Sequence, residues 1–198
     1  MIALINYEAG NIRSVTKALE KCGGIIEVTN RAEVIRKADK VILPGVGAFG
    51  KAMDALDRFG LTAVLREAAA QKPFLGICVG LQLLFEVSEE SPGVRGLSVL
   101  KGRVRRFPEG VKIPHLGWNR VKQMKPSPLW KDLPDGQFYY FANSYYAEPE
   151  DQDVIAGMTD YNVDFTSAIM RDQLFGVQFH PEKSQKWGLK ILENFIRL

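Results

Sequence analysis

Reactive side chains are scarce in this sequence: its 198 residues include only two cysteines, Cys22 and Cys78, and only two histidines, His115 and His180. Two cysteines could form one disulfide, but an intracellular compartment would keep both reduced. No apolar run reaches the roughly 18 residues that a membrane-spanning helix needs. The N-terminus, MIALINYEAGN, lacks the basic start and long apolar stretch of a secretory signal. We therefore expect a cytoplasmic protein that uses few reactive side chains, no metal and no cofactor.

Neither positive nor negative charge is in large excess in this sequence. The formal net charge is +3, and the charged residues, 25% of the chain, are spread along it rather than gathered into tails. This pattern gives no indication of nucleic-acid binding. An apolar fraction of 46% is typical of a folded globular protein. There is no internal repeat and no Ser/Gly-rich linker, so we predict a single domain over residues 1–198.

The first half of the chain alternates short apolar runs with helical patterns. The strand-like runs are Met1–Asn6, Ile25–Thr29, Lys40–Leu43 and Phe74–Ile77. Helical patterns follow at about residues 12–22 and 32–38, then twice before Ala70, and again at about residues 80–86. Such β-α alternation predicts a parallel sheet with helices on both faces.

The second half is rich in strands. Its strand-like segments, separated by Pro, Gly and Asp clusters, are Val99–Phe107, Val111–Lys122, Gln137–Glu148, Val154–Met158, Thr166–Met170 and Leu174–Phe179. A last helix is predicted over Ser184–Leu198. We therefore predict an α/β fold with an open, mostly parallel, flavodoxin-like sheet, helices on both faces, and an added antiparallel β section in the second half.

The segment Gly76-Ile77-Cys78-Val79-Gly80 links a buried strand directly to a helix. This is the layout of a nucleophile elbow, with Cys in place of the usual Ser. A Cβ at either flanking glycine would collide with neighbouring backbone in so tight a turn. The helix N-terminus favours a thiolate, and the Val79 N–H points at a developing oxyanion. A buried structural cysteine is the alternative for Cys78, and it is the preferred interpretation for Cys22 on the apolar stripe of the first helix.

A cysteine nucleophile needs a general base, and His180 is the better of the two candidates. It ends an apolar strand, and in an open parallel sheet ligands gather beyond the carboxyl ends of the strands. Glu182, two residues on, can accept the imidazole N–H and hold the tautomer that deprotonates sulfur. His115 has no carboxylate nearby in sequence, so we interpret it as structural.

The loop Gly45-Val46-Gly47 follows the third strand, in the position that supplies the second oxyanion donor in elbow enzymes. We therefore expect Val46 and Val79 to form the oxyanion hole, with a simple strand-to-helix turn as the alternative for the loop. Arg103 and Arg105 alternate along one strand, which is typical of a solvated face.

Five segments together resemble the class I (triad) glutamine amidotransferases. They are residues 76–85 (GICVGLQLLF), 180–184 (HPEKS), 6–11 (NYEAGN), 43–50 (LPGVGAFG) and 114–119 (PHLGWN). The resemblance runs from end to end of the chain. The triad motif is shared by many members, whereas the other segments are typical of one branch, whose members release ammonia for a separate cyclase subunit in histidine biosynthesis.

The resemblance implies glutamine as the substrate and hydrolysis through a Cys78 thioester, with proton transfer by His180. It implies a glutamine pocket lined by Gly47, Gln82, Glu90, Ser144 and Tyr145. It also implies a heterodimer with the cyclase, which would be faced by Asn11, Ser14, Trp118 and Lys183. The chain departs from the family pattern where Asn143 replaces a common His and where Glu8 and Gln185 replace a usual Gly.

Three other functions remain open. The glutaminase subunit of pyridoxal phosphate synthase has a similar size and triad, but its usual loop after the third strand resembles Gly-Gly-Glu-Ser rather than Pro-Gly-Val-Gly. A cysteine hydrolase or peptidase on the same fold would need an open cleft for a polymer. A catalytically idle binding subunit is disfavoured by the intact Cys, His and Glu. The elements use the whole chain and leave no acceptor domain, which favours a separate partner.

Overall fold

A computed structural model describes all residues from 1 to 198. The parallel part of its sheet contains, in chain order, β1 (Ile2–Ile5), β2 (Ile26–Thr29), β3 (Lys40–Gly45), β4 (Phe74–Cys78) and β12 (Leu174–Val177). Their spatial order is β2-β1-β3-β4-β12. Every residue of β1, β4 and β12 is buried. Continuous apolar runs are what a parallel sheet covered on both faces requires, and the predicted β-α alternation is confirmed.

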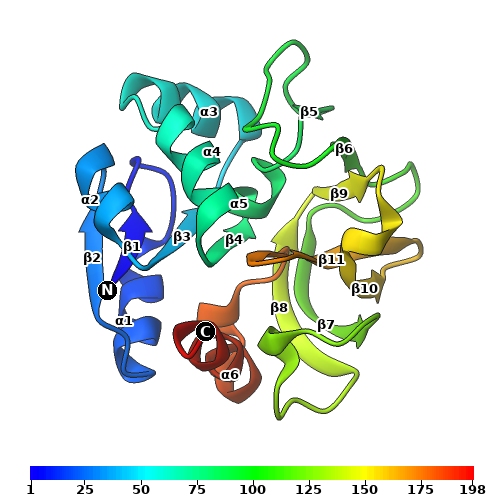
Figure 1. The fold of residues 1–198 in the computed structure, drawn as a ribbon. Helices are drawn as coiled ribbons and strands as arrows, with labels where there is room; N and C mark the ends of the chain where they lie inside the picture. Colours follow the sequence, from blue (N-terminus) through cyan, green and yellow to red (C-terminus); the bar gives the residue numbers. More distant parts are fainter.

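Six helices cover this part of the sheet: α1 (Ile12–Lys21), α2 (Ala32–Lys37), α3 (Phe49–Arg58), α4 (Thr62–Gln71), α5 (Val79–Gln82) and α6 (Gln185–Ile196). Helix α1 packs beside α6, whereas α2 packs with α4 and α3 with α5 (Figure 1). The two groups lie on opposite faces of the sheet, as predicted. None of these helices combines the length and the apolar character that crossing a bilayer requires.

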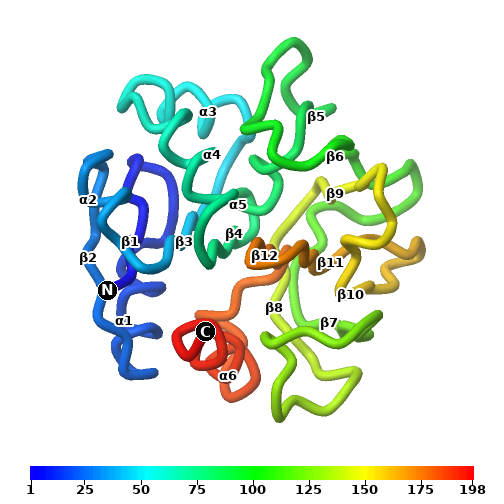
Figure 2. The backbone as a smooth tube through the Cα atoms, in the orientation of Figure 1, coloured from blue at the N-terminus to red at the C-terminus, as the bar shows by residue number.

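The rest of the sheet is antiparallel except for the short parallel pair β5–β6. Its strands are β5 (Val87–Ser88), β6 (Gly102–Arg106), β7 (His115–Gln123), β8 (Gln137–Asn143), β9 (Tyr145–Pro149), β10 (Ile155–Asp160) and β11 (Asp164–Arg171). The short 3-10 helices are η1 (Pro128–Trp130), η2 (Gln152–Val154) and η3 (Pro181–Lys183). Strand β11 pairs with β12 on one side and with β10 on the other. The orange-to-red segment from β12 to α6 therefore lies between the two halves (Figure 2).

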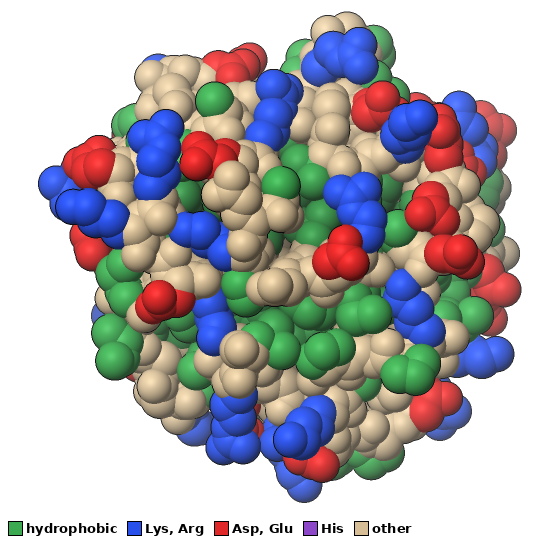
Figure 3. Space-filling view, viewed as in Figure 1, with side chains coloured by type: hydrophobic (Ala, Val, Ile, Leu, Met, Phe, Trp, Pro, Cys, Tyr) green, Lys and Arg blue, Asp and Glu red, His purple; other side chains and the backbone are tan.

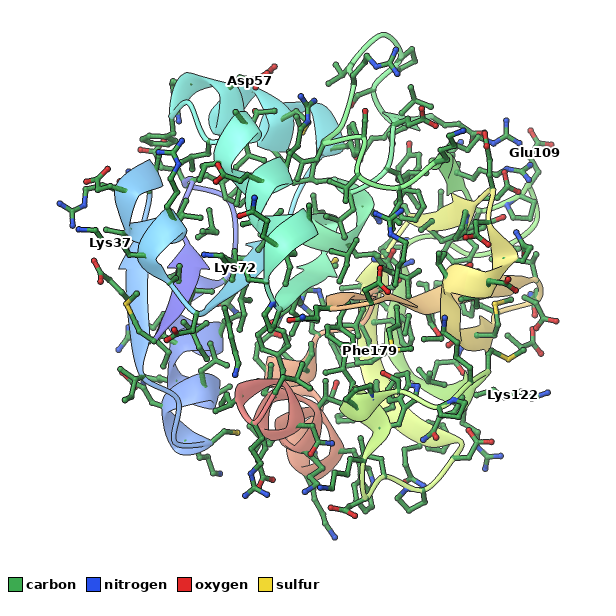
Figure 4. The ribbon with its side chains drawn as sticks, viewed as in Figure 1. Lys37, Asp57, Lys72, Glu109, Lys122 and Phe179 are labelled. Atoms are coloured by element: carbon green, nitrogen blue, oxygen red, sulfur yellow. The ribbon has the colours of Figure 1, made fainter.

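One cluster of 55 buried residues forms the hydrophobic core and extends through both halves. Within it the ring of Phe179 stacks on Tyr139, with centroids 4.3 Å apart. Figure 4 places Phe179 well inside the outline of the molecule and the charged residues Asp57 and Glu109 at its rim. Because Phe179 directly precedes His180, its packing helps to hold that histidine in place.

Charged side chains of both signs are interspersed over the face shown in Figure 3, without a single basic patch. On β6, Arg103 and Arg105 both bind Glu148, at 2.7 Å each, and the two side chains are 52% and 41% exposed. The predicted solvated face is therefore confirmed. Surface ion pairs of this kind each contribute at most about 1 kcal/mol to stability.

Two predicted elements differ from those observed. The helix predicted over residues 80–86 ends at Gln82, because the carbonyls of residues 83–85 accept hydrogen bonds from the returning segment 97–100 instead. The strand predicted over residues 137–148 is two strands, β8 and β9. The chain changes partners at Ser144, since β8 pairs with β7 whereas β9 pairs with β6 and β11.

Gly80 lies where α5 approaches β3 most closely, and a Cβ there would lie 1.8 Å from the Leu43 carbonyl oxygen. We expect Gly80→Ala to lower the free energy of unfolding by about 3 kcal/mol or more, because backbone must shift. Denaturant unfolding measures this loss. Gly93→Ala is the control without a steric clash: Gly93 has a φ of 86°, unlike Gly80, but has nothing within 4 Å of the added methyl. It should cost only about 1–2 kcal/mol, and equal losses would contradict the steric explanation.

Candidate active site

Cys78 stands at the turn between β4 and α5. Its backbone has φ 54° and ψ −111°, a conformation that non-glycine residues rarely adopt and that costs roughly 1–3 kcal/mol. The flanking glycines make this turn possible, since a Cβ on Gly76 would lie 2.7 Å from the Gly80 carbonyl oxygen. The predicted collisions are therefore confirmed. The turn brings the Cys78 side chain to the wall of a cavity.

His180 reaches the same edge of the sheet. Strand β12 lies parallel to β4, with Val177 opposite Ile77, so both chains leave the sheet at its carboxyl edge, as predicted. The imidazole Nδ1 lies 2.9 Å from Glu182 Oε1, and both side chains are buried. Because a carboxylate only accepts, Nδ1 carries the proton and Nε2 is left to face Cys78.

Electrostatics in this cluster favour a charged imidazole. Burial alone would lower the pKa of His180, but the hydrogen bonds and negative charges of Cys78 and Glu182 outweigh it and raise that pKa. The second carboxylate oxygen of Glu182, Oε2, is buried without a partner. His180 is therefore the only hydrogen-bond partner of this carboxylate. The imidazole can take the thiol proton and carry a positive charge beside the sulfur.

His115 has a different environment. Its ring stacks on Phe141 and on Tyr161, with centroids 4.8 Å and 3.9 Å away. Burial lowers the pKa of His115 to about 4, so the imidazole is neutral near pH 7. No carboxylate binds it, and it does not line the cavity beside Cys78. The structural interpretation of His115 is confirmed.

A buried hydroxyl fixes the backbone at His180. Ser184 Oγ donates to the His180 carbonyl at 2.6 Å and accepts from the Tyr140 amide at 2.9 Å. The His180 amide in turn donates to the Tyr140 carbonyl at 2.9 Å. These bonds tie the segment after β12 to β8, so the imidazole is held by a rigid frame rather than by a free loop.

The loop after β3 lies against the elbow. Gly45 is opposite Cys78 in the parallel register, and the buried Tyr7 hydroxyl donates to the Pro44 carbonyl at 2.8 Å. Burial and the neighbouring Cys78 raise the pKa of Tyr7, so this hydroxyl keeps its proton. The hydrogen bonds of the loop do not include one from the Val46 amide. That amide is a free donor beside the elbow.

The cavity at Cys78 has a volume of 270 Å³ and brings together most of the predicted site. Its lining includes Cys78 and His180, both expected oxyanion donors, Val46 and Val79, and all five residues of the expected glutamine pocket: Gly47, Gln82, Glu90, Ser144 and Tyr145. Glu90 also accepts from the Phe49 amide at 2.7 Å and so caps α3. No group of three or more His, Cys, Asp or Glu side chains is placed to hold a metal ion.

The model of the glutamine amidotransferase class-I family matches residues 3–198. The chain belongs to this family. The amidotransferase is 50% identical over 196 residues to the imidazole glycerol phosphate synthase subunit HisH of Desulfitobacterium hafniense, covering 98% of this chain and 93% of the relative. It is 48% identical to the subunit of the same name from Methanocaldococcus jannaschii, covering 100% of both chains.

Solved structures show the same fold at low identity. A crystal structure of a glutamine amidotransferase matches this one with a TM-score of 0.79 at 15% identity, covering 100% of both chains. PurLQS from Thermotoga maritima matches with a TM-score of 0.74 at 18% identity, covering 99% of this chain and 97% of that chain. The predicted fold class is confirmed.

The residues expected to face a cyclase belong to η3, β7 and the start of α1, and one of them, Lys183, lines the cavity of this amidotransferase. Lys183 lines the cavity, with its Nζ 5.6 Å from the Tyr140 ring centroid. Trp118 is 45% exposed and meets the same ring edge-on at 6.2 Å. Asn11 and Ser14 lie at the start of α1, which packs against η3, the element that contains Lys183. Lys183 and Trp118 therefore share Tyr140 as a neighbour.

The three departures from the family pattern have visible consequences. Glu8 and Gln185 adopt φ of 66° and 50°, the left-handed region that glycine enters without strain. This requirement explains why glycine is usual there. Glu8 also forms an exposed ion pair with Arg58 at 2.5 Å. Asn143 donates from Nδ2 to the Tyr145 carbonyl at 3.0 Å, so it supports the backbone of the pocket.

Sequence analysis missed three residues that contact the site: Tyr7, Gln178 and Ser184. Gln178 is fully buried, and its Nε2 lies 3.6 Å from Cys78 Sγ. A polar residue interrupting the apolar run 174–179 was a signal that could have drawn attention to it. Cys22, by contrast, ends α1 away from the cavity, and burial raises its pKa.

Proposed function

We propose that this amidotransferase is the glutaminase subunit of imidazole glycerol phosphate synthase in histidine biosynthesis. One observation carries the hydrolytic part: Cys78 and His180 both line a 270 Å³ cavity, and the buried Glu182 carboxylate lies 2.9 Å from the His180 Nδ1. Relatives about 50% identical over nearly the full length bear the name of this subunit, which supports the pathway.

The proposed reaction begins with proton transfer from Cys78 to His180 and attack of the sulfur on the carboxamide carbon of glutamine. The Val46 and Val79 amides stabilise the oxyanion of the tetrahedral intermediate. His180 then protonates the leaving nitrogen, so that ammonia departs and a glutamyl thioester remains. Water, deprotonated by His180, attacks the thioester and releases glutamate and the thiol. Glu182 stabilises the imidazolium in both steps.

A separate cyclase subunit receives the ammonia in this proposal. There it joins a phosphoribulosyl-formimino carboxamide nucleotide to give imidazole glycerol phosphate and aminoimidazole carboxamide ribotide. The exposed aromatic and apolar side chains on the paired strands β7 and β8, Leu116, Trp118 and Phe138, support a docking partner on this surface. Lys183, next to Glu182 and His180, can pair with a carboxylate on the cyclase and carry a signal to them.

The alternatives explain less. A peptidase needs a cleft that admits a chain, whereas a cavity of 270 Å³ suits a single small substrate. The loop after β3 reads Pro44-Gly45-Val46-Gly47, unlike the usual loop of the pyridoxal phosphate synthase glutaminase. An idle binding subunit would not need the strained backbone at Cys78. Labelling of Cys78 by a reactive glutamine analogue would exclude that last alternative directly.

We expect the isolated chain to be a poor glutaminase that is activated about a hundredfold by a cyclase loaded with its nucleotide. Such activation corresponds to about 2.7 kcal/mol, which one oxyanion-hole donor can supply. Ammonia released without an acceptor would be wasted, which is the reason to expect coupling. Glutamine turnover is measured with the chain alone, with empty cyclase and with nucleotide-loaded cyclase.

Equal, measurable rates in the three conditions would contradict the coupling but leave the glutaminase in place. No glutamate production in any of them would contradict the proposed function itself. Lys183→Ala serves as the companion variant. We expect it to lower the ratio of turnover with nucleotide-loaded cyclase to turnover of the chain alone. A ratio equal to that of the wild type would show that Lys183 does not transmit the activation.

A further inference from the structure

Gln178 is a buried carboxamide beside the nucleophile, and the mechanism above does not use it. It directly follows β12, and its backbone amide donates to the Ser167 carbonyl at 2.9 Å. Its side chain is fully buried, with Nε2 3.6 Å from Cys78 Sγ and Oε1 3.1 Å from Gln82 Nε2. Such a residue has lost its water and must find its hydrogen bonds inside the protein.

The hydrogen-bond network determines which end of this carboxamide faces the sulfur. The Tyr145 carbonyl can only accept, and Gln82 Nε2 lies 3.0 Å from it. Gln82 therefore presents its NH₂ group, whose other hydrogen points to Gln178. Gln178 must then present Oε1 to Gln82, and its own NH₂ group faces Cys78. The orientation follows from a backbone carbonyl whose role is unambiguous.

We propose that Gln178 is a positioning residue that donates an N–H to the Cys78 sulfur, so that the thiolate formed by proton transfer to His180 is stabilised and aimed into the cavity. An N–H donor stabilises an anionic acceptor more than a neutral one, so this contact favours the thiolate over the thiol. Gln82, which lines the cavity, orients Gln178 and thereby connects the pocket wall to the nucleophile. The kinetic part of this inference rests on the proposed glutaminase activity.

Other groups around the sulfur act in distinguishable ways. His180 reaches it from the segment after β12, and Tyr7 lies near it from the end of β1. Glu90 and Lys183 are the remaining charged groups on the cavity wall. Gln178 is uncharged at every pH of interest. Its replacement by the uncharged Met should therefore shift a pH profile of sulfur reactivity without adding a new titration step.

The test is the rate of Cys78 alkylation by iodoacetamide as a function of pH, in which the thiolate displaces iodide. Cys22→Ser provides the background, so that only one thiol reacts. We expect Gln178→Met to raise the midpoint of the profile by about one pH unit, equivalent to a tenfold loss of rate at lower pH. Gln178→Glu should raise it further, because a carboxylate replaces the donor. Gln173→Met, in the exposed turn that precedes β12, should leave the midpoint unchanged.

Turnover of glutamine gives a second readout. With the cyclase bound, Gln178→Met should lower kcat about tenfold and change KM less than threefold, because the pocket is intact while the nucleophile is weakened. Unchanged midpoints in both Gln178 variants would overturn the proposal. If Gln178→Met fails to fold, the profile of the nearly isosteric Gln178→Glu decides alone. If neither variant folds, Gln178 is a residue of the core, and the proposal is overturned as well. Alkylation needs neither glutamine nor cyclase, so an inactive wild type with the expected shift would count only against the proposed function.

Discussion

Cys78→Ala is expected to abolish glutamine hydrolysis, with a fall in turnover of about ten-thousandfold or more. Cys78 supplies the only thiol on the cavity wall, and the strained turn that carries it brings it there. The complex of this variant with its cyclase should still make product from free ammonia. Both activities are measured on the same preparation, one with glutamine and one with an ammonium salt.

The ammonia-dependent reaction is the informative control for this variant. Its loss together with glutamine hydrolysis would show that Cys78 has a structural or interface role instead. Cys22→Ala is the matched substitution, since Cys22 lies at the end of α1 and donates only to the Leu189 carbonyl. That variant should retain both activities.

His180→Ala is expected to lower glutamine turnover at least about a thousandfold, because both the acylation and the hydrolysis step lose their proton carrier. Glu182→Gln should lower it less, by about ten- to a hundredfold. The amide can still hold one imidazole orientation but no longer stabilises the imidazolium, at a cost of roughly 1.5–3 kcal/mol. Steady-state kinetics with nucleotide-loaded cyclase give both numbers.

The buried pair also predicts a change in pH dependence. The negative charge of Glu182 contributes to raising the pKa of His180, so Glu182→Gln should move the loss of imidazolium to lower pH.

His115→Ala is the companion variant, and it should affect stability more than turnover, since its ring packs in the antiparallel half. Equal losses of turnover in His180→Ala and Glu182→Gln would require a new role for Glu182. A more damaging His115→Ala would mean that the base was misassigned.

Local geometry explains how much of this site could be predicted. The requirement for glycine at positions 76 and 80 arises from atoms a few residues away, and the turn they permit determines where Cys78 points. The β-α alternation of the first half follows in the same way from the spacing of apolar residues. The length of α5 could not be predicted, because residues 97–100 return to take up the carbonyls that would have continued the helix.

The sequence by itself determined the class of fold and was sufficient to predict a nucleophile, a base and its carboxylate, since each depends on neighbours within a short stretch of chain. Only the tertiary structure decided what stands around them. The contact of Gln178 with Cys78 joins residues 100 positions apart and exists because β12 pairs with β4 rather than with another strand. The tie from Ser184 to Tyr140 likewise depends on the place of β8 relative to β12. Which strands pair depends on contacts between distant parts of the chain, because pairing is determined by which faces of the sheet become buried. No local sequence pattern specifies it.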